Sequence, residues 1–528
     1  MTRGASAPGE HTGGGSRDAL LIVGLIAVAA ALRFLRLGEW NFDSDEIFML
    51  RDSINLQGNN PRPLLYVLNH YLVLPFLPFD EFSLRLLPAI FGVLAIPTLY
   101  LVGRRLVGSR AALFGALLLT VSGLHIYYSQ FARYWTLVFL LSAIYPYALY
   151  IGLRERNPRA FVLGLVTGGL AVISHPASVL LMGGFAIWMA ITYLKPDHMV
   201  RLWRQKNVQW GVLLLVIVAV GVVWRFIPLL RGWISQRDRI PRGEFLLHLP
   251  GIEGVKELLI LSAYVESLTL PLVLFAAIGI AFLWHRDRPL AMLLTSMFIF
   301  PVAFILLLSF RTPISTFYLV PASPIIFLAA GVFLDRLAEV EWELRPRWLI
   351  PAAVTAVILA TGAPTLISQY RDGRRYDFRG AAEWLSERRK PGDIVFSDQP
   401  QVMTHYLGGA EAQRLVPDLP LLTRSVHQLS EPGSVWIVAP YTAKGSHRTN
   451  PKIISLKSWI YDNCRLRNAV GVARLDFRVN ELQIFECSPA QAGVRPSAGA
   501  LAPLSRDLNP LVAGLARPTR PPLAAAVA

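Results

Sequence analysis

The chain has 528 residues, of which 54% are hydrophobic and only 16% are charged. This composition is unlike that of soluble domains and predicts that most of the chain faces lipid. The formal charge of +16 does not indicate nucleic-acid binding, because the arginines and lysines fall mainly in short clusters between apolar runs, where the positive-inside bias of membrane proteins places them.

The hydrophobic runs predict a polytopic α-helical membrane protein. Residues 1–18 form a polar tail, and no small-residue cleavage site follows the first run, so we expect a retained helix rather than a signal peptide. A membrane core about 30 Å thick needs roughly 20 apolar residues per helix. Eleven spans are expected, at residues 19–37, 84–103, 111–127, 134–153, 160–174, 177–194, 209–229, 257–284, 289–309, 315–334 and 348–367. The Pro-flanked apolar segment 64–79 is instead typical of an interfacial or re-entrant helix.

Basic clusters between these spans predict the orientation of the chain. If the N-terminus is cytoplasmic, every second loop lies inside and receives a basic cluster. These clusters contain Arg104, Arg105, Arg110, Arg154, Arg156, Arg159, Lys195, Arg201, Arg204, Lys206, Arg286, Arg288, Arg336, Arg345 and Arg347. A transmembrane domain over residues 19–369 then places its first loop, residues 38–83, on the outer face of the plasma (inner) membrane. The residues after the last span also fall on this periplasmic or extracellular side.

After the last span the sequence changes to that of a soluble α/β domain, over residues 370–487. A helix-like segment at 380–389 precedes strand-like segments at 393–397, 435–439, 470–476 and 481–487, of which the last two form a terminal hairpin. Residues 488–528 are rich in Pro, Ala and Arg and predict a disordered tail.

The chain's two cysteines, Cys464 and Cys487, both lie in this α/β domain. Two cysteines exclude a disulfide framework and a Cys-based zinc cluster. An oxidising outer compartment would permit the two thiols to pair, and two buried free thiols are the alternative.

Three acidic residues in four positions follow the first span: Asp43, Asp45 and Glu46. Aromatic and apolar neighbours such as Trp40 would hold this segment near the membrane surface, where partial desolvation raises the pKa of a carboxyl group. Such a carboxylate suits a general base that takes a proton from a hydroxyl group. The alternative is a helix cap, in which Asp43 or Ser44 caps a helix that begins near Asp45 and Glu46 completes a capping box.

Further polar residues lie at the predicted outer ends of other spans. They are Arg62, Arg85, Gln130, Arg133, Tyr134, His175, Arg311 and Tyr318. Snorkelling and the interfacial aromatic belt explain any one of them. Their gathering on one face of the membrane favours an anionic lipid-linked substrate, because guanidinium groups pair with phosphate. Acids near His175 would suit a divalent metal ion, but no spacing of His and Asp specifies one.

Four short motifs occur in order between Arg33 and His175. They are Asp45-Glu46, Pro63-Leu-Leu-Tyr66, Phe82-Ser-Leu-Arg85-Leu-Leu-Pro and Ser129-Gln130-Phe-Ala-Arg133-Tyr134. In order and spacing these motifs resemble the lipid-dependent glycosyltransferases of the GT-C superfamily. The nearest groups are the bacterial relatives of protein O-mannosyltransferases and the aminoarabinose transferases.

The resemblance implies a GT-C fold and an inverting transfer of a hexose or pentose from a polyprenyl-phosphate donor. The acceptor would be an envelope glycan, lipid or protein on the outer face. Asp45 would be the base or would position the acceptor, with Glu46 as its partner. Arg62 lies within one residue of a phosphate-binding Lys of the aminoarabinose transferases. Those enzymes also place a basic residue close after the acidic pair, whereas the nearest here is Arg51, which argues against that activity.

Two other classes of function stay open on the sequence alone. A transporter or flippase of a lipid-linked saccharide would place ionisable residues within spans and between internal repeats, whereas the polar residues here gather at helix ends. A non-catalytic envelope scaffold would leave the three acidic residues unexplained. Because the donor of the expected reaction is already an activated phosphodiester, no nucleotide-binding glycine loop and no organic cofactor are expected.

Overall fold

The computed structural model describes residues 15–56, 62–193, 268–309, 316–340, 349–409, 412–415, 419–428, 433–440, 451–471 and 481–487. The predicted span at 209–229, Arg311 and the predicted tail at 488–528 lie outside these ranges. The chain divides into two compact units. The helical unit comprises Met1–Leu37, Leu56–Pro75 and Arg85–Ile367, and the sheet unit comprises Gly38–Asn55, Phe76–Leu84 and Ser368–Ala528.

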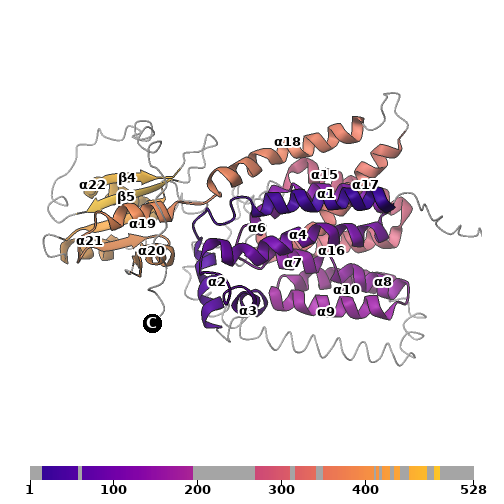
Figure 1. The fold of residues 1–528 in the computed structure, drawn as a ribbon, viewed down its shortest axis with the longest axis horizontal. Helices are drawn as coiled ribbons and strands as arrows, with labels where there is room; N and C mark the ends of the chain where they lie inside the picture. The colour runs from indigo at the N-terminus through magenta and orange to yellow at the C-terminus, as the bar shows by residue number, and fades with distance from the viewer. Residues whose placement is uncertain are drawn as a thin grey trace, which may run out of the picture. The chain divides into compact units, whose positions relative to one another are not determined.

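Long apolar helices make up the helical unit, and most of them run alongside one another (Figure 1). The elements are α1 (Gly15–Phe34), α3 (Pro63–Leu72), α4 (Glu81–Leu106), α5 (Ser109–Thr120), α6 (Gly123–Ser129), α7 (Trp135–Ser142), α8 (Tyr145–Arg154), α9 (Pro158–Ser174), α10 (Ser178–Tyr193), α15 (Leu270–Arg286), α16 (Arg288–Ser309), the 3-10 helix η2 (Thr316–Ala322), α17 (Ser323–Glu339) and α18 (Leu349–Asp372). The apolar residues cover all sides of these helices rather than one stripe, as is typical of helices that face lipid.

Five of the described helical segments are long and apolar enough to cross a membrane, judged by length and composition. They are Glu81–Leu106, Trp135–Arg154, Arg288–Leu307, Phe317–Glu339 and Leu349–Arg371. The pair α5 and α6, bent by 61°, would be a sixth span, and α9, α10 and α15 are shorter apolar helices. These helices occupy most of the predicted spans, whereas the total of eleven remains a prediction. The segment predicted to be interfacial or re-entrant contains only the ten-residue helix α3.

Backbone contact between α5 and α17 depends on glycines at two positions. A Cβ atom added at Gly331 of α17 would lie 2.2 Å from the carbonyl oxygen of Ala111 in α5. A Cβ atom added at Gly115 of α5 would lie 2.9 Å from the carbonyl oxygen of Phe327 in α17. The two glycines therefore let α5 and α17 approach more closely than any larger residue would allow, which is a common way to pack helices in membranes.

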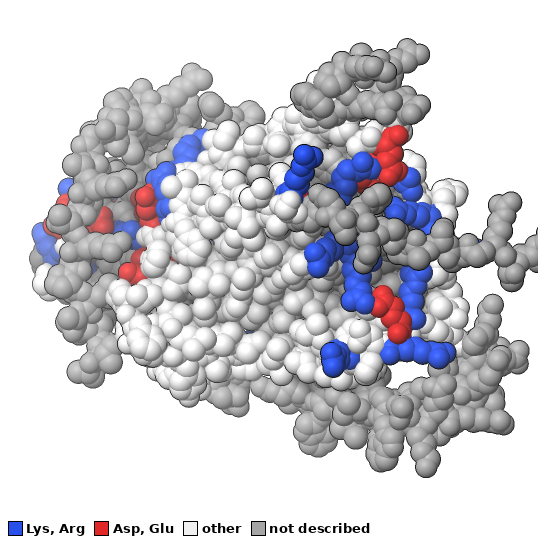
Figure 2. Space-filling model, turned by 45° about the vertical axis from the view of Figure 1, so that its right-hand side comes forward, with Lys and Arg blue, Asp and Glu red and all other residues white. Residues whose placement is uncertain are grey.

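Charged side chains gather at one end of the helical unit, beside a broad surface that carries almost none (Figure 2). Ion pairs join Arg105 to Glu155, Arg110 to Asp335 and Arg154 to Asp287. These pairs connect the ends of α4, α5, α8 and α17, so the loops predicted to lie inside share one end of the unit. Such a distribution is typical of a helix bundle in lipid.

A five-stranded mixed sheet is the centre of the sheet unit, in the order β2-β1-β3-β5-β4. The strands are β1 (Ile394–Ser397), β2 (Ala412–Arg414), β3 (Val435–Pro440), β4 (Arg465–Val470) and β5 (Leu482–Cys487). β1 pairs in parallel with β2 and β3, whereas β5 pairs antiparallel with β3 and β4. β1, β3 and β5 lie where strands are predicted. The strand predicted at 470–476 lies mostly outside the described part of the chain, and the described hairpin partner of β5 is β4, which ends at Val470.

Helices cover both faces of this sheet. They are α19 (Phe378–Ser386), α20 (Pro400–Tyr406), α21 (Leu419–Gln428) and α22 (Pro451–Asn463), and α2 (Ser44–Asn55) packs against α20. Trp436 and Val438 of β3 join the apolar cluster under α19 and α20, whereas Val435 and Ile437 join the cluster under α21 and α22. This alternation follows from the two-residue period of a strand.

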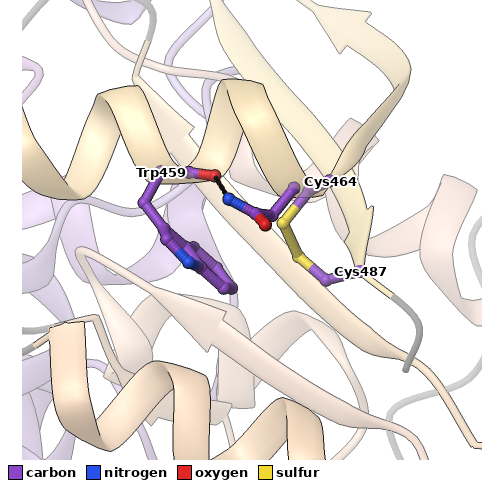
Figure 3. The surroundings of a disulfide bond; sticks show 4 residues. Trp459, Cys464 and Cys487 are labelled. Atoms are coloured by element: carbon purple, nitrogen blue, oxygen red, sulfur yellow. Dashed lines mark hydrogen bonds between the residues drawn. A yellow bond between two sulfur atoms is a disulfide. The ribbon is translucent and has the colours of Figure 1, made fainter. Parts of the chain in front are cut away.

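A disulfide bond joins Cys464 to Cys487, which places the end of α22 on β5 (Figure 3). Cys487 is completely buried, and Trp459 of α22 packs against the same apolar cluster. The two thiols therefore form the pair that an oxidising compartment would permit, and the alternative of two buried free thiols is wrong.

We expect the Cys464→Ser/Cys487→Ser double variant to lower the free energy of unfolding of the sheet unit by about 3 kcal/mol, the loop-closure value for this separation. The separation between the cysteines is 23 residues. Proteolysis of the full-length chain in detergent over a series of urea concentrations measures the loss. A reductant should lower the free energy of unfolding of the wild type by the same amount and leave that of the double variant unchanged. Equal resistance of wild type and variant would contradict the prediction.

Candidate active site

The acidic segment after the first helix begins α2 and caps it. The backbone N–H of Asp45 donates to Asp43 Oδ1 at 3.1 Å, and the backbone N–H of Asp43 donates to Glu46 Oε2 at 3.0 Å. These bonds satisfy N–H groups that a helix start otherwise leaves unpaired. The predicted capping box is therefore present, with Asp43 as the N-cap and Glu46 at the third helical position.

Glu46 also forms a buried ion pair with Arg375. Arg375 Nη1 lies 2.6 Å from Glu46 Oε2 and Nη2 lies 3.4 Å from Oε1, and the two side chains are 4% and 0% exposed. The pairing is bidentate, the strongest geometry between Arg and a carboxylate. Sequence reasoning missed Arg375. The available signal was a pair of arginines, Arg374 and Arg375, after the last predicted span, where the predicted outer location leaves them unexplained by the positive-inside bias.

The three acidic side chains therefore differ in environment. Asp43 and Asp45 are half-buried, whereas Glu46 has no exposed surface. Burial raises the pKa of the Asp43 carboxyl above its ordinary value, and the nearby Arg375 guanidinium offsets part of this rise. Glu46 is thus bound to Arg375 and Asp43 caps the helix, whereas the expected role of Asp45 as a base stays a prediction.

In the helical unit, two of the predicted arginines meet at Tyr134. Arg62, the residue before α3, donates from Nη1 to the Tyr134 hydroxyl at 2.6 Å. The guanidinium carbon of Arg62 lies 5.3 Å from the centroid of the Tyr134 ring, and that of Arg133 lies 5.1 Å from it. Two guanidinium groups thus share one aromatic ring, which concentrates positive charge at this position.

His175 completes this cluster at the C-terminal end of α9. Its ring stacks on Tyr134 with the centroids 4.7 Å apart, and its Nδ1 accepts the backbone N–H of Ala177 at 3.0 Å. Because Nδ1 is an acceptor, the neutral ring carries its proton on Nε2. Nε2 is buried and has no hydrogen-bond partner among the described residues. It is therefore a donor available to a ligand, although this proton position is inferred from the hydrogen bonds.

Aromatic side chains surround the imidazole. Tyr318 of η2 lies 5.4 Å from the His175 ring, and Trp135 of α7 lies 4.7 Å from it, measured between centroids. The structure thus brings together five of the predicted residues: Arg62, Arg133, Tyr134, His175 and Tyr318. They come from segments far apart in the sequence and all lie in the helical unit.

Arg85 and Gln130 are placed differently, at the end of α1. Arg85 Nη1 donates to the carbonyl of Leu37 at 3.1 Å, and Gln130 Nε2 donates to the carbonyl of Leu35 at 2.8 Å. Both side chains are completely buried. These bonds satisfy carbonyl groups at the helix terminus, so the two residues have a structural role in addition to any contact with a substrate.

Metal ligands were expected only from acids near His175. Within the described ranges, no three His, Cys, Asp or Glu side chains lie close enough to hold a metal ion.

Comparison with known proteins gives one family and one fold. Residues 62–226 match the family of dolichyl-phosphate-mannose-protein mannosyltransferases. A search of curated protein sequences gave no match. Among solved structures, ArnT from Cupriavidus metallidurans bound to undecaprenyl phosphate is similar with a TM-score of 0.54 and 16% identity, covering 92% of this chain and 100% of that one. The apo form of the same protein gives 0.53 and 15%, covering 91% and 100%.

An archaeal protein has a similar fold. The oligosaccharyltransferase AglB from Archaeoglobus fulgidus, in complex with an inhibitory peptide and a dolichol-phosphate, gives a TM-score of 0.51 at 15% identity, covering 88% of this chain and 75% of that one. At these identities the structural likeness concerns the fold alone.

The cap at Asp43 provides a test that separates its geometry from its charge. We expect Asp43→Ala to destabilise the sheet unit by about 1 kcal/mol, because a helix loses its N-cap acceptor. Asp43→Asn should lower the stability of the sheet unit only slightly, because Asn caps a helix as well as Asp does and carries no charge to bury. Thermal unfolding of the purified chain at pH 7 compares the two variants. Equal losses in both would show that the charge, rather than the cap, is what matters at this position.

Proposed function

We propose that this chain is a member of the GT-C superfamily and transfers a sugar from a polyprenyl-phosphate donor to an acceptor at the outer face of the membrane. The observation that carries the proposal is the cluster of Arg62, Arg133 and His175 around Tyr134. Two guanidinium groups and a buried N–H donor at helix ends suit the phosphate of a lipid whose chain lies among apolar helices. The match to the mannosyltransferase family and the likeness to ArnT support the same reading.

The proposed reaction is a single displacement. The acceptor hydroxyl oxygen attacks the anomeric carbon while Asp45 takes the hydroxyl proton. The bond from the anomeric carbon to the phosphate oxygen breaks, and the polyprenyl phosphate leaves with the electron pair and a growing negative charge. Arg62 and Arg133 would stabilise that charge, with His175 Nε2 as a further donor. Attack from the face opposite the leaving group inverts the configuration of the sugar.

The location follows from two features in separate units. We assign the charged end of the helical unit to the cytoplasmic side, in line with the positive-inside bias. The disulfide between Cys464 and Cys487 favours an oxidising compartment for the sheet unit. The protein would thus be a multi-pass protein of the plasma (inner) membrane, with its acidic segment and sheet unit outside. An envelope glycan, a lipid or a protein would be the acceptor.

A transporter of a lipid-linked saccharide is the second candidate, and one observation favours it. Broken helices with buried ionisable groups are common at transport sites. Here α5 and α6 meet at a 61° bend, where the buried Arg33 contacts His125 Nδ1 at 3.0 Å. Arg33 also donates to the carbonyls of Leu119 and Thr120, so the bend has a structural explanation as well.

The first test concerns Asp45. We expect Asp45→Asn to lower sugar transfer from a polyprenyl-phosphate donor by roughly 100- to 10,000-fold, because an amide cannot accept the proton. Sugar release from a radiolabelled undecaprenyl-phosphate donor by purified protein measures the effect, with unchanged donor binding as the control for folding. A transporter would release no sugar in this assay. Turnover by Asp45→Asn at the rate of the wild type would refute the assigned role.

The second test concerns the anion cluster. Arg62→Gln and Arg133→Gln should each weaken the binding of undecaprenyl phosphate about tenfold, since each removes a charged donor. Arg159→Gln is the matched control, because this exposed arginine lies at the other end of the helix that precedes His175. Fluorescence-quenching titration in detergent gives the dissociation constants. If the two cluster variants bind as tightly as Arg159→Gln, the cluster does not hold the phosphate.

A further inference from the structure

Within the sheet unit, several residues of the C-terminal part bind the acidic segment. Arg375 makes the most central of these contacts. Arg375 pairs with Glu46 and also donates from Nη1 to the carbonyl of Asn41 at 3.0 Å. It therefore contacts the chain on both sides of Asp43. Glu46 in turn accepts the backbone N–H of Asp43, so a single guanidinium group supports the start of α2 through its capping box.

A second fastening involves Tyr406 of α20. Its hydroxyl accepts the backbone N–H of Phe42 at 2.6 Å and donates to Glu81 Oε1 at 2.7 Å. Arg379 of α19 forms an ion pair with the same Glu81 and lies over the Tyr406 ring at 5.5 Å. Both ends of the first outer loop, at Phe42 and at Glu81, are thus bound by residues that come after the last predicted span.

Close packing at Trp40 adds a third fastening. Gly373 adopts a positive φ of 63°, and a Cβ atom there would lie 2.5 Å from Cγ of Trp40. Glycine is the residue that meets both demands, since it tolerates this backbone conformation and leaves room for the indole ring. The turn from Gly373 to Arg375 is therefore shaped to receive the segment that precedes Asp43.

We infer that Arg375 is a positioning residue for catalysis: by holding Glu46 and the carbonyl of Asn41, it fixes the orientation in which the start of α2 presents Asp45 to the acceptor. The sheet unit is on this view part of the catalytic machinery rather than an appended domain. The inference rests on the proposed function, because it assigns to Asp45 the role of base. It gives Glu46 a different role from the expected one, that of a link between Arg375 and the helix start.

The positive charge of Arg375 also affects the pH dependence of the reaction. The charged groups that face Asp43 are Arg375, Asp45 and Glu46. Arg375 lowers the pKa of Asp43 against the effect of burial. Without its positive charge, the three carboxyl groups would lose the cation that offsets the burial of Asp43, and the first of them would take up a proton at a higher pH. The acid limb of the rate profile should therefore move to higher pH.

The experiment compares Arg375→Gln, Arg375→Lys and Glu46→Gln with the control Arg465→Gln, which changes an exposed arginine of β4, all in the full-length chain. We expect Arg375→Gln and Glu46→Gln to lower kcat roughly 10- to 100-fold, the range expected for misplaced catalytic groups, with the KM for the donor unchanged. The double variant Glu46→Gln/Arg375→Gln should be no slower than either single variant, because both changes break one pair. Arg375→Lys should restore the wild-type acid limb but only part of kcat, since lysine keeps the charge and loses the bidentate geometry.

Each outcome decides between the two claims. If Asp45→Asn is inactive while Arg375→Gln has the kcat and pH profile of the wild type, the positioning role is wrong and the proposed function stands. If Asp45→Asn is fully active, Asp45 is not the base and the positioning role of Arg375 falls with it, and if the wild type itself releases no sugar from the donor, the proposed function fails. Should Arg375→Gln fail to accumulate in the membrane, Arg375→Lys decides alone: wild-type kcat would overturn the inference, and a reduced kcat with normal binding of undecaprenyl phosphate would support it.

Discussion

A carboxylate that is removed from water needs a positive charge beside it. In this protein that constraint joins the segment after the first helix to the residues that follow the last described membrane helix. Glu46 has no exposed surface, and Arg375 supplies its counterion. Breaking such a buried pair from one side typically costs about 3 to 5 kcal/mol, because the remaining charge is left without compensation. The conformation of the segment from Asn41 to Glu46 therefore depends on Arg375, in the C-terminal part of the same unit.

The same requirement for compensation governs the helical unit, where it acts on the backbone. The bend between α5 and α6 takes the carbonyls of Leu119 and Thr120 out of the regular helical pattern, and Arg33 donates to both. Gln130 does the same for carbonyls at the end of α1. Inside a membrane such groups find no water, so a polar side chain must reach them. The turn that follows α6 thus combines a structural residue, Gln130, with Arg133 and Tyr134 of the candidate site.

Local patterns in the sequence were enough to predict most of the described helices, the capping box at Asp43 and the proximity of the polar residues at helix ends. Length and hydrophobicity fix a membrane helix, and cap chemistry is decided within four residues. The pairing of Glu46 with Arg375 could not be predicted in this way, because it depends on the tertiary fold. The sequence likewise did not show that Arg85 and Gln130 bind carbonyl groups, since a buried polar side chain and a substrate ligand look alike in a motif.

The distance along the chain between Glu46 and its cation has a consequence for biogenesis. The two residues are 329 positions apart. At usual rates of synthesis, roughly 5 to 20 residues per second, the ribosome needs about 15 to 65 s to pass from one to the other. During that interval α2 and the residues before it exist without Arg375, and the acidic segment cannot reach its final conformation. The conformation of this segment can therefore form only after the last described helix and the turn that contains Arg375 have been synthesised.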